Sequence, residues 1–203
     1  MAEHQPPLRR ISGATPGSPA GISPKQLAML CLFGSLTMLF GASIVGYLIT
    51  RSQNDIWKTA TMPGLPLGLI VSTLLLAALS VAMHRALRAV RENGFERLQR
   101  SLMLALFLGV AFVMAQALNW RVMFAATTAT DARTLYGFTF YMLTGLHALH
   151  VLAGFVPLHV ALNKAKRREY SSSNHEGIKL CTQYWDYLGV VWCVLLGVLY
   201  FAT

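Results

Sequence analysis

The stretch LYGFTFYMLTGLHALHVLAGFVPLHVALN, residues Leu135–Asn163, contains no Asp, Glu, Lys or Arg in 29 consecutive positions. A helix needs about 20 predominantly apolar residues to cross a hydrocarbon core of about 30 Å, and this stretch is long enough to do so. Because lipid offers no partners for backbone N–H and C=O groups, a spanning segment must satisfy them internally. We therefore predict one transmembrane helix here.

Four other stretches have a similar length and composition. They are Gln26–Thr50, Leu65–Met83, Ser101–Trp120 and Leu180–Ala202. The whole chain of 203 residues is 55% hydrophobic and 12% charged, whereas about 25% of the residues of a soluble domain are charged. No stretch shows the alternating pattern of barrel strands. The predicted fold is all-α, an integral membrane bundle of five transmembrane helices in one domain over residues 25–203.

Residues 1–24 differ from the rest of the chain. They contain five of the eight prolines, together with Gly, Ser and Ala, and lack the apolar core of a signal peptide. A segment of this composition buries too little apolar surface to offset its ordering entropy, so we expect a flexible cytoplasmic tail.

The three cysteines lie in or beside the apolar stretches, without CxxC spacing. They are Cys31, Cys181 and Cys193. This pattern favours buried, inert thiols over a disulfide or metal framework.

The basic residues indicate an orientation. The net charge of +9 comes from short blocks between apolar stretches, which is typical of membrane loops and not of a nucleic-acid surface. The tail and the loops after the second and fourth stretches carry 13 Lys and Arg, against 4 on the opposite side. The positive-inside rule then places the amino terminus in the cytoplasm and the carboxyl terminus in the periplasm. Six basic residues are candidates for contact with anionic lipid head groups: Arg85, Arg88, Lys164, Lys166, Arg167 and Arg168.

Polar side chains gather on one face of the fourth predicted helix. At 100° per residue, His147, His150 and Gly154 lie within about 60° of one another, with Thr144 on the flank. Haem ligation is one interpretation, although all the deeply placed histidines are on one helix. A di-metal site is another, although it needs more ligands, including carboxylates, than the spans supply. We favour a structural face that fixes helix packing by hydrogen bonds or meets a lipid head group.

Asp186 is the only acidic residue inside a predicted span. We expect it to face His147 and His150 and to complete the structural polar face, while a role in a proton path is the functional alternative. Other residues are assigned to helix packing: Gly145, Gly154, Trp185, Trp192 and Gln116, the last with Asn119 as a partner in hydrogen bonds between helices. No catalytic centre, cofactor site or metal site is predicted in this chain.

Three motifs together resemble the subunit III family of haem-copper oxidases, which use cytochrome c or quinol as electron donor. They are TGLHALHVLAG at 144–154, YWDYLGVVW at 184–192 and GVAFVMAQALNW at 109–120. The resemblance extends over about residues 25–203 and is closest to the short, five-helix form of the family. The chain departs from the family at four positions: Leu36 and Asn119 stand in place of glutamates, Asp186 in place of a histidine and Gly189 in place of an aspartate.

The resemblance implies an accessory subunit without redox centres in a bacterial plasma membrane. Such a subunit packs on subunit I, associates with subunit II or a respiratory supercomplex, and holds phospholipid in a cleft between the first two and the last three helices. Haem and copper are then expected in the partner subunits, which reduce oxygen and translocate protons in aerobic respiration. The alternatives are an accessory protein of a nitric oxide reductase and a free-standing membrane transporter or scaffold.

Overall fold

Five helices make up the computed structural model, which describes residues 24–53, 67–129 and 135–201. The helices are α1 (Pro24–Ser52), α2 (Gly68–Arg91), α3 (Phe95–Ala129), α4 (Leu135–Lys166) and α5 (Glu176–Phe201). Each is long and apolar enough to cross a membrane. The prediction of an all-α protein with five spanning helices is therefore confirmed. The predicted tail lies outside the described residues except for Pro24, which begins α1.

The helices extend beyond the apolar stretches that predicted them. We expected the second helix to end at Met83, but α2 continues to Arg91. In the same way α3 begins at Phe95 and not at Ser101. The apolar pattern marks only the part of a helix that must lie in hydrocarbon, and helical hydrogen bonds continue into the head-group region.

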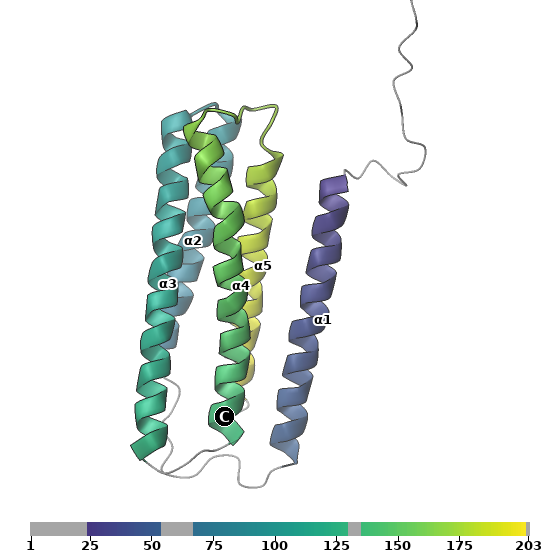
Figure 1. Ribbon diagram of the computed structural model, residues 1–203, viewed down its shortest axis with the longest axis vertical. Helices are drawn as coiled ribbons and strands as arrows, with labels where there is room; N and C mark the ends of the chain where they lie inside the picture. The colour runs from purple at the N-terminus through teal and green to yellow at the C-terminus, as the bar shows by residue number, and fades with distance from the viewer. Residues whose placement is uncertain (1–23, 54–66, 130–134, 202–203) are drawn as a thin grey trace, which may run out of the picture.

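A tight turn joins α2 to α3. Asn93 has a φ of 53°, a left-handed conformation that asparagine tolerates better than most residues, and Gly94 N–H donates to the Ala89 carbonyl at 2.8 Å. The Asn93 side chain accepts a hydrogen bond from the Ser172 backbone N–H at 2.9 Å. The α2–α3 and α4–α5 connections therefore meet at one end of the bundle (Figure 1).

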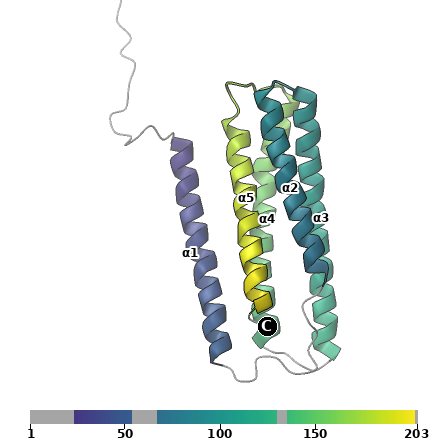
Figure 2. The ribbon, with the colours of Figure 1, turned by 180° about the vertical axis from the view of Figure 1, so that it is seen from behind.

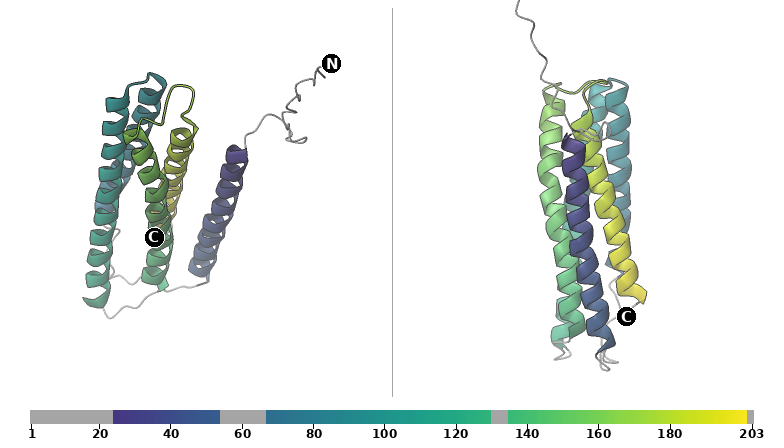
Figure 3. Two further views of the ribbon diagram at one scale, coloured as in Figure 1. Left: turned by 45° about the horizontal axis from the view of Figure 1, so that its top comes forward. Right: turned by 90° about the vertical axis from the view of Figure 1, so that its right-hand side faces the viewer.

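Helices α2 to α5 form the main bundle. α2 packs against α3 and α5, and α4 packs against the same two helices, as Figures 1 and 2 show. Among the described residues, α1 contacts only α4 and α5, and it stands at one side of the bundle (Figure 3). The expected cleft between the first two and the last three helices is therefore wrong, because α2 belongs to the main bundle.

A few contacts attach α1 to α5. The Lys25 ammonium lies 3.2 Å from the Glu176 carboxylate. About two to three turns further on, the ring of Phe33 stacks on Tyr187 at 4.7 Å, and Thr37 Oγ1 lies 3.0 Å from the Tyr187 hydroxyl. Only Leu36, Phe40 and Tyr47 of α1 are buried. This helix is thus held along one narrow face.

The expectation of three buried cysteines is correct for Cys181 alone. Cys31 and Cys193 are exposed on the surface of the chain. An apolar helix presents part of its circumference to lipid, so position in an apolar stretch does not establish burial inside the protein.

Candidate functional site

The predicted histidine face lies in the centre of the bundle, but the histidines do not connect the helices by hydrogen bonds. His147 is completely buried, with its ring 5.0 Å from Trp192 and 5.9 Å from Phe112. Neither of its ring nitrogens has a hydrogen-bond partner among the described residues. His150 Nδ1 lies 2.7 Å from the carbonyl of Leu146 in its own helix. Aromatic packing, and not the expected histidine hydrogen bonding, thus joins α4 to its neighbours here.

Thr144 does form a hydrogen bond between helices. Its hydroxyl accepts a hydrogen bond from Trp120 Nε1 of α3 at 3.0 Å, and the Tyr141 hydroxyl donates to the Trp120 carbonyl at 3.2 Å. On the other side of α4, the Tyr184 hydroxyl of α5 donates to the His150 carbonyl at 2.9 Å. These bonds fix the rotation of α4 relative to both neighbours.

A second buried polar group joins α2 to α3. Asn119 Nδ2 donates to Ser72 Oγ at 3.2 Å, and Ser72 Oγ donates to Gln116 Oε1 at 3.4 Å. All three side chains are buried. The sequence indicated Gln116 and Asn119 as partners in hydrogen bonds between helices but not Ser72, which is an isolated hydroxyl in an apolar stretch.

Asp186 points away from His147 and His150, contrary to our expectation. Its Oδ1 accepts a hydrogen bond from Ser80 Oγ of α2 at 2.5 Å, and its Oδ2 lies 3.6 Å from His84 Nε2. Asp186 is two residues from Tyr184, which faces α4, so the two side chains point about 200° apart around α5. The carboxylate therefore belongs to the α2–α5 contact and not to the polar face of α4.

The two tryptophans of α5 lie in the core, each with 1% of its surface exposed. Trp192 Nε1 donates to Thr73 Oγ1 of α2 at 3.0 Å. Trp185 packs edge-on against Phe155 at 5.8 Å and lies close to Gly154, where the two helix backbones approach. Gly145 has more room, since a Cβ there would meet only the Trp120 ring at 3.9 Å.

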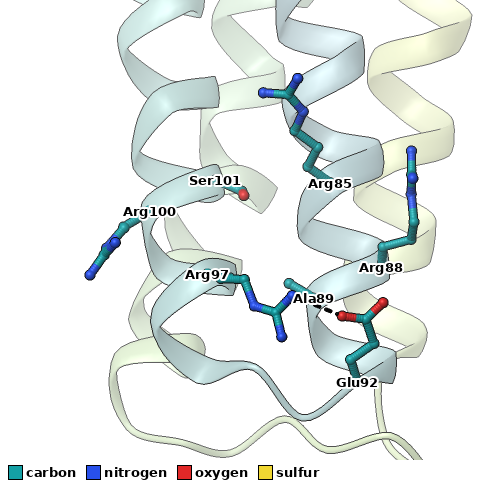
Figure 4. Close-up of a pocket in the computed structure, with 7 residues that line it drawn as sticks. All are labelled: Arg85, Arg88, Ala89, Glu92, Arg97, Arg100 and Ser101. Atoms are coloured by element: carbon teal, nitrogen blue, oxygen red, sulfur yellow. Dashed lines mark ion pairs between the residues drawn. The ribbon is translucent and has the colours of Figure 1, made fainter.

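A basic pocket of about 320 Å³ lies between α2 and α3 at the end that carries their connection. Four arginines and a single glutamate line it, together with Ala89 and Ser101: Arg85, Arg88, Arg97, Arg100 and Glu92. Figure 4 shows Arg97 turned toward Glu92 and Arg100 pointing outward. The Arg97 guanidinium lies 3.1 Å from the Glu92 carboxylate, and that of Arg100 lies 3.1 Å from the carboxylate of Glu96.

Two arginines of this pocket are free to bind an anion. Arg85 and Arg88 have no acidic group within 4 Å among the described residues. A guanidinium group with unused donors suits a phosphate group, which accepts paired N–H bonds. Both side chains line the pocket, and Figure 4 shows that they extend in different directions from α2.

The predicted basic residues do not form one site. Arg85 and Arg88 lie together in the pocket, where Arg97 and Arg100 join them because the Asn93 turn folds α3 back along α2. The four from the fourth helix and its end, Lys164, Lys166, Arg167 and Arg168, are exposed and do not line this pocket. The sequence indicated Arg97 and Arg100 only as basic residues of the loop after the second stretch and did not predict that they line a pocket.

Chemically, these groups provide packing, hydrogen bonds between helices and a cationic pocket. Among the described residues there is no group of three or more His, Cys, Asp or Glu side chains that could hold a metal ion.

Comparison with known proteins gives a consistent result. The family model described as "Cytochrome c oxidase subunit III" matches residues 28–203. The chain is 30% identical over 179 residues to "Cytochrome c oxidase subunit 3" of a Synechocystis species, covering 84% of this chain and 75% of that protein. The protein of the same name from Thermostichus vulcanus is 25% identical over 184 residues, with 88% of both chains covered. That of Spodoptera frugiperda is 32% identical over 126 residues, covering 62% of this chain and 83% of the relative.

Proposed function

The chain belongs to the cytochrome c oxidase subunit III family, and from this membership we propose that it works as a non-redox accessory subunit of a haem-copper terminal oxidase, packed on catalytic subunit I. The observation that supports this most strongly is the family match over residues 28–203, which includes all five spanning helices except the first turn of α1. The complex as a whole carries out aerobic electron transfer to oxygen with proton translocation, and its haem and copper are held by subunits I and II.

We place the chain in a bacterial inner membrane with its amino terminus in the cytoplasm. The excess of Lys and Arg on the side of the α2–α3 and α4–α5 connections supports this orientation. His147, Thr144 and the two tryptophans of α5 then fix the helix packing that presents the outer surface to subunit I.

We further propose that the basic pocket holds the phosphate of an anionic phospholipid. Arg85 and Arg88 supply the unused donors, whereas Arg97 and Arg100 border the pocket and are paired with Glu92 and Glu96. At the cytoplasmic surface the pocket would meet the anionic leaflet, where each nearby basic residue contributes about 1 kcal/mol to attraction. The exposed basic residues at the end of α4 do not line this pocket and add only general attraction to the anionic head groups.

Purification in a mild detergent through a tag on the amino-terminal segment tests the function. We expect the chain to bring with it the two larger oxidase subunits, haem absorption in the visible spectrum and stoichiometric copper. A His147→Phe variant should give the same spectrum, because His147 packs among aromatic rings and donates no hydrogen bond to a described residue. A colourless protein would contradict the proposal. Loss of haem from the His147→Phe variant with the complex intact would indicate that His147 is a haem ligand. An eluate that reduces nitric oxide but not oxygen would indicate an accessory protein of a nitric oxide reductase.

Lipid analysis of the same complex tests the pocket. The double variant Arg85→Gln and Arg88→Gln should retain several-fold less anionic phospholipid per complex, because the two unpaired guanidinium groups are lost. The double variant Lys164→Gln and Lys166→Gln removes the same charge outside the pocket. It should retain more anionic phospholipid per complex than the Arg85 and Arg88 double variant. Equal losses from both pairs would indicate attraction by general surface charge and contradict a specific pocket.

A further inference from the structure

A groove runs along the outer surface of α2 and α5. Its first part has a volume of about 540 Å³ and reaches from Ser80 and Asp186 to Val194. At Cys193 it adjoins a second hollow of about 370 Å³ that extends to Leu67 and Phe201. The 15 residues from Asp186 to Tyr200 correspond to about 21 Å along α5, a large part of the hydrocarbon thickness of about 30 Å.

Asp186 marks one end of this groove and is incompletely covered. Its side chain is 35% exposed, and that of His84 beside it is 52% exposed. Asp186 lies six residues, about 9 Å, inside the apolar stretch of α5 that begins at Leu180, and Ser80 lies three residues inside the apolar stretch of α2 that ends at Met83. The carboxylate is therefore just inside the edge of the hydrocarbon, at the end of the bundle that carries the α2–α3 connection. An acidic group that faces lipid at this depth is unfavourable, and such groups normally face protein.

Within the described ranges, the chain does not complete the environment of this carboxylate. Ser80 donates one hydrogen bond to Oδ1, and His84 lies at 3.6 Å from Oδ2. A carboxylate accepts about four hydrogen bonds, so acceptor sites remain on the groove side. α1 does not cover them, because it packs on the neighbouring Tyr187 and, among the described residues, makes no contact with α2.

The shape of the groove suits a helix. Ala77 and Gly189 lie among the residues that line it, and a Cβ placed on Gly189 would meet nothing within 4 Å. Small residues of this kind allow two helix backbones to approach closely in a membrane. Val190 and Val194 are 63% and 48% exposed along the groove and provide apolar contact surface.

We propose that this groove is the docking surface for a transmembrane helix of another subunit, which places a cationic or hydrogen-bond-donating side chain on Asp186. The proposal rests on the proposed function, which supplies the complex. Charge favours a protein helix over an anionic phospholipid, since a lipid phosphate is repelled by the carboxylate and an acyl chain leaves it without donors. A helix can present Arg, Lys, Asn or Gln at the depth of Asp186.

Photo-crosslinking in the purified complex tests this surface. The photoreactive residue p-benzoylphenylalanine is introduced at Val190, in the groove, or as a control at Phe107 of α3, which is similarly exposed at 69%. We expect irradiation to join Val190, but not Phe107, to one membrane subunit of the complex. Asp186→Asn keeps an acceptor for Ser80 but removes the charge, and should reduce both crosslink yield and subunit retention by at least about tenfold. Asp186→Glu keeps the negative charge and should give most of the crosslink yield of the native chain.

The outcomes separate the two proposals, because co-purification with haem and copper is read before irradiation. An intact complex in which Val190 acquires only adducts of lipid mass, or crosslinks no better than Phe107, would overturn the docking surface and leave the oxidase function standing. Absence of the complex would overturn the proposed function itself and the docking helix with it. If Asp186→Asn fails to fold, the Val190 crosslink in the otherwise native chain still decides the question.

Discussion

Replacing Trp192 with alanine should lower the free energy of unfolding by about 3–5 kcal/mol, the usual range for removing a buried tryptophan. Trp192 is 1% exposed and lies against Phe112 and His147 in the centre of the bundle. Its loss would leave a cavity among three helices and remove the hydrogen bond to Thr73. In a membrane, close packing and hydrogen bonds between helices hold the bundle, so a cavity acts directly on them.

Unfolding in increasing concentrations of a denaturing detergent, followed by tryptophan fluorescence or circular dichroism, measures this change. Trp192→Phe keeps an aromatic ring but loses the bond to Thr73, and should cost about 1–2 kcal/mol. Val156→Ala shortens a side chain of α4 that is 67% exposed, and should change stability by less than about 0.5 kcal/mol. If Trp192→Ala lowered the free energy of unfolding no more than Val156→Ala, the result would contradict the burial of Trp192 in the core.

Replacing Gly154 with leucine should destabilise the bundle by about 3 kcal/mol or more, at the upper end of the cost of overpacking. A Cβ at this position would lie 2.8 Å from Tyr184 Cε1 and 3.2 Å from Trp185 Cζ2. Neither ring can move away easily, since the Tyr184 hydroxyl is bonded to the His150 carbonyl and Trp185 is fully enclosed. The substitution would therefore separate α4 from α5.

Alanine substitutions at the two glycines of α4 provide the matched comparison in the same assay. Gly145→Ala should be neutral or stabilising by up to about 1 kcal/mol, because a helix gains from alanine and the nearest atom is 3.9 Å away. Gly154→Ala should be destabilising by about 1–2 kcal/mol despite that gain. Similar effects at both positions would contradict a close approach at Gly154.

The number and type of the helices could be read from the sequence because hydrocarbon imposes a strict length and composition on each span. The start of α4 at Leu135 was predicted correctly, since Arg133 lies just before the uncharged stretch. The end of α2 was not, because Arg85, Arg88 and Arg91 resemble a loop in composition yet continue the helix outside the hydrocarbon.

The direction of Asp186 shows what the helical period leaves open. Periodicity establishes that Asp186 and Tyr184 lie on different faces of α5, but it does not say which neighbouring helix each face meets. That depends on the packing of α2 against α5. Ser80, which donates the hydrogen bond to Asp186, could not be recognised as its partner, because it is an isolated serine in an apolar stretch. The basic pocket was missed for a related reason, as it forms only when the Asn93 turn places α3 beside α2.

The position of α1 has a consequence for the order of assembly during synthesis. α1 leaves the ribosome before the other four helices described, yet all its contacts within the described part of the chain are with α4 and α5, which are made after α2 and α3. It must therefore remain in the lipid without contact to α4 and α5 until these two helices have been inserted. Lys25 reaches Glu176 only after some 150 further residues have been translated. The nascent chain thus completes its main bundle and closes the α1 contact as one of its final events.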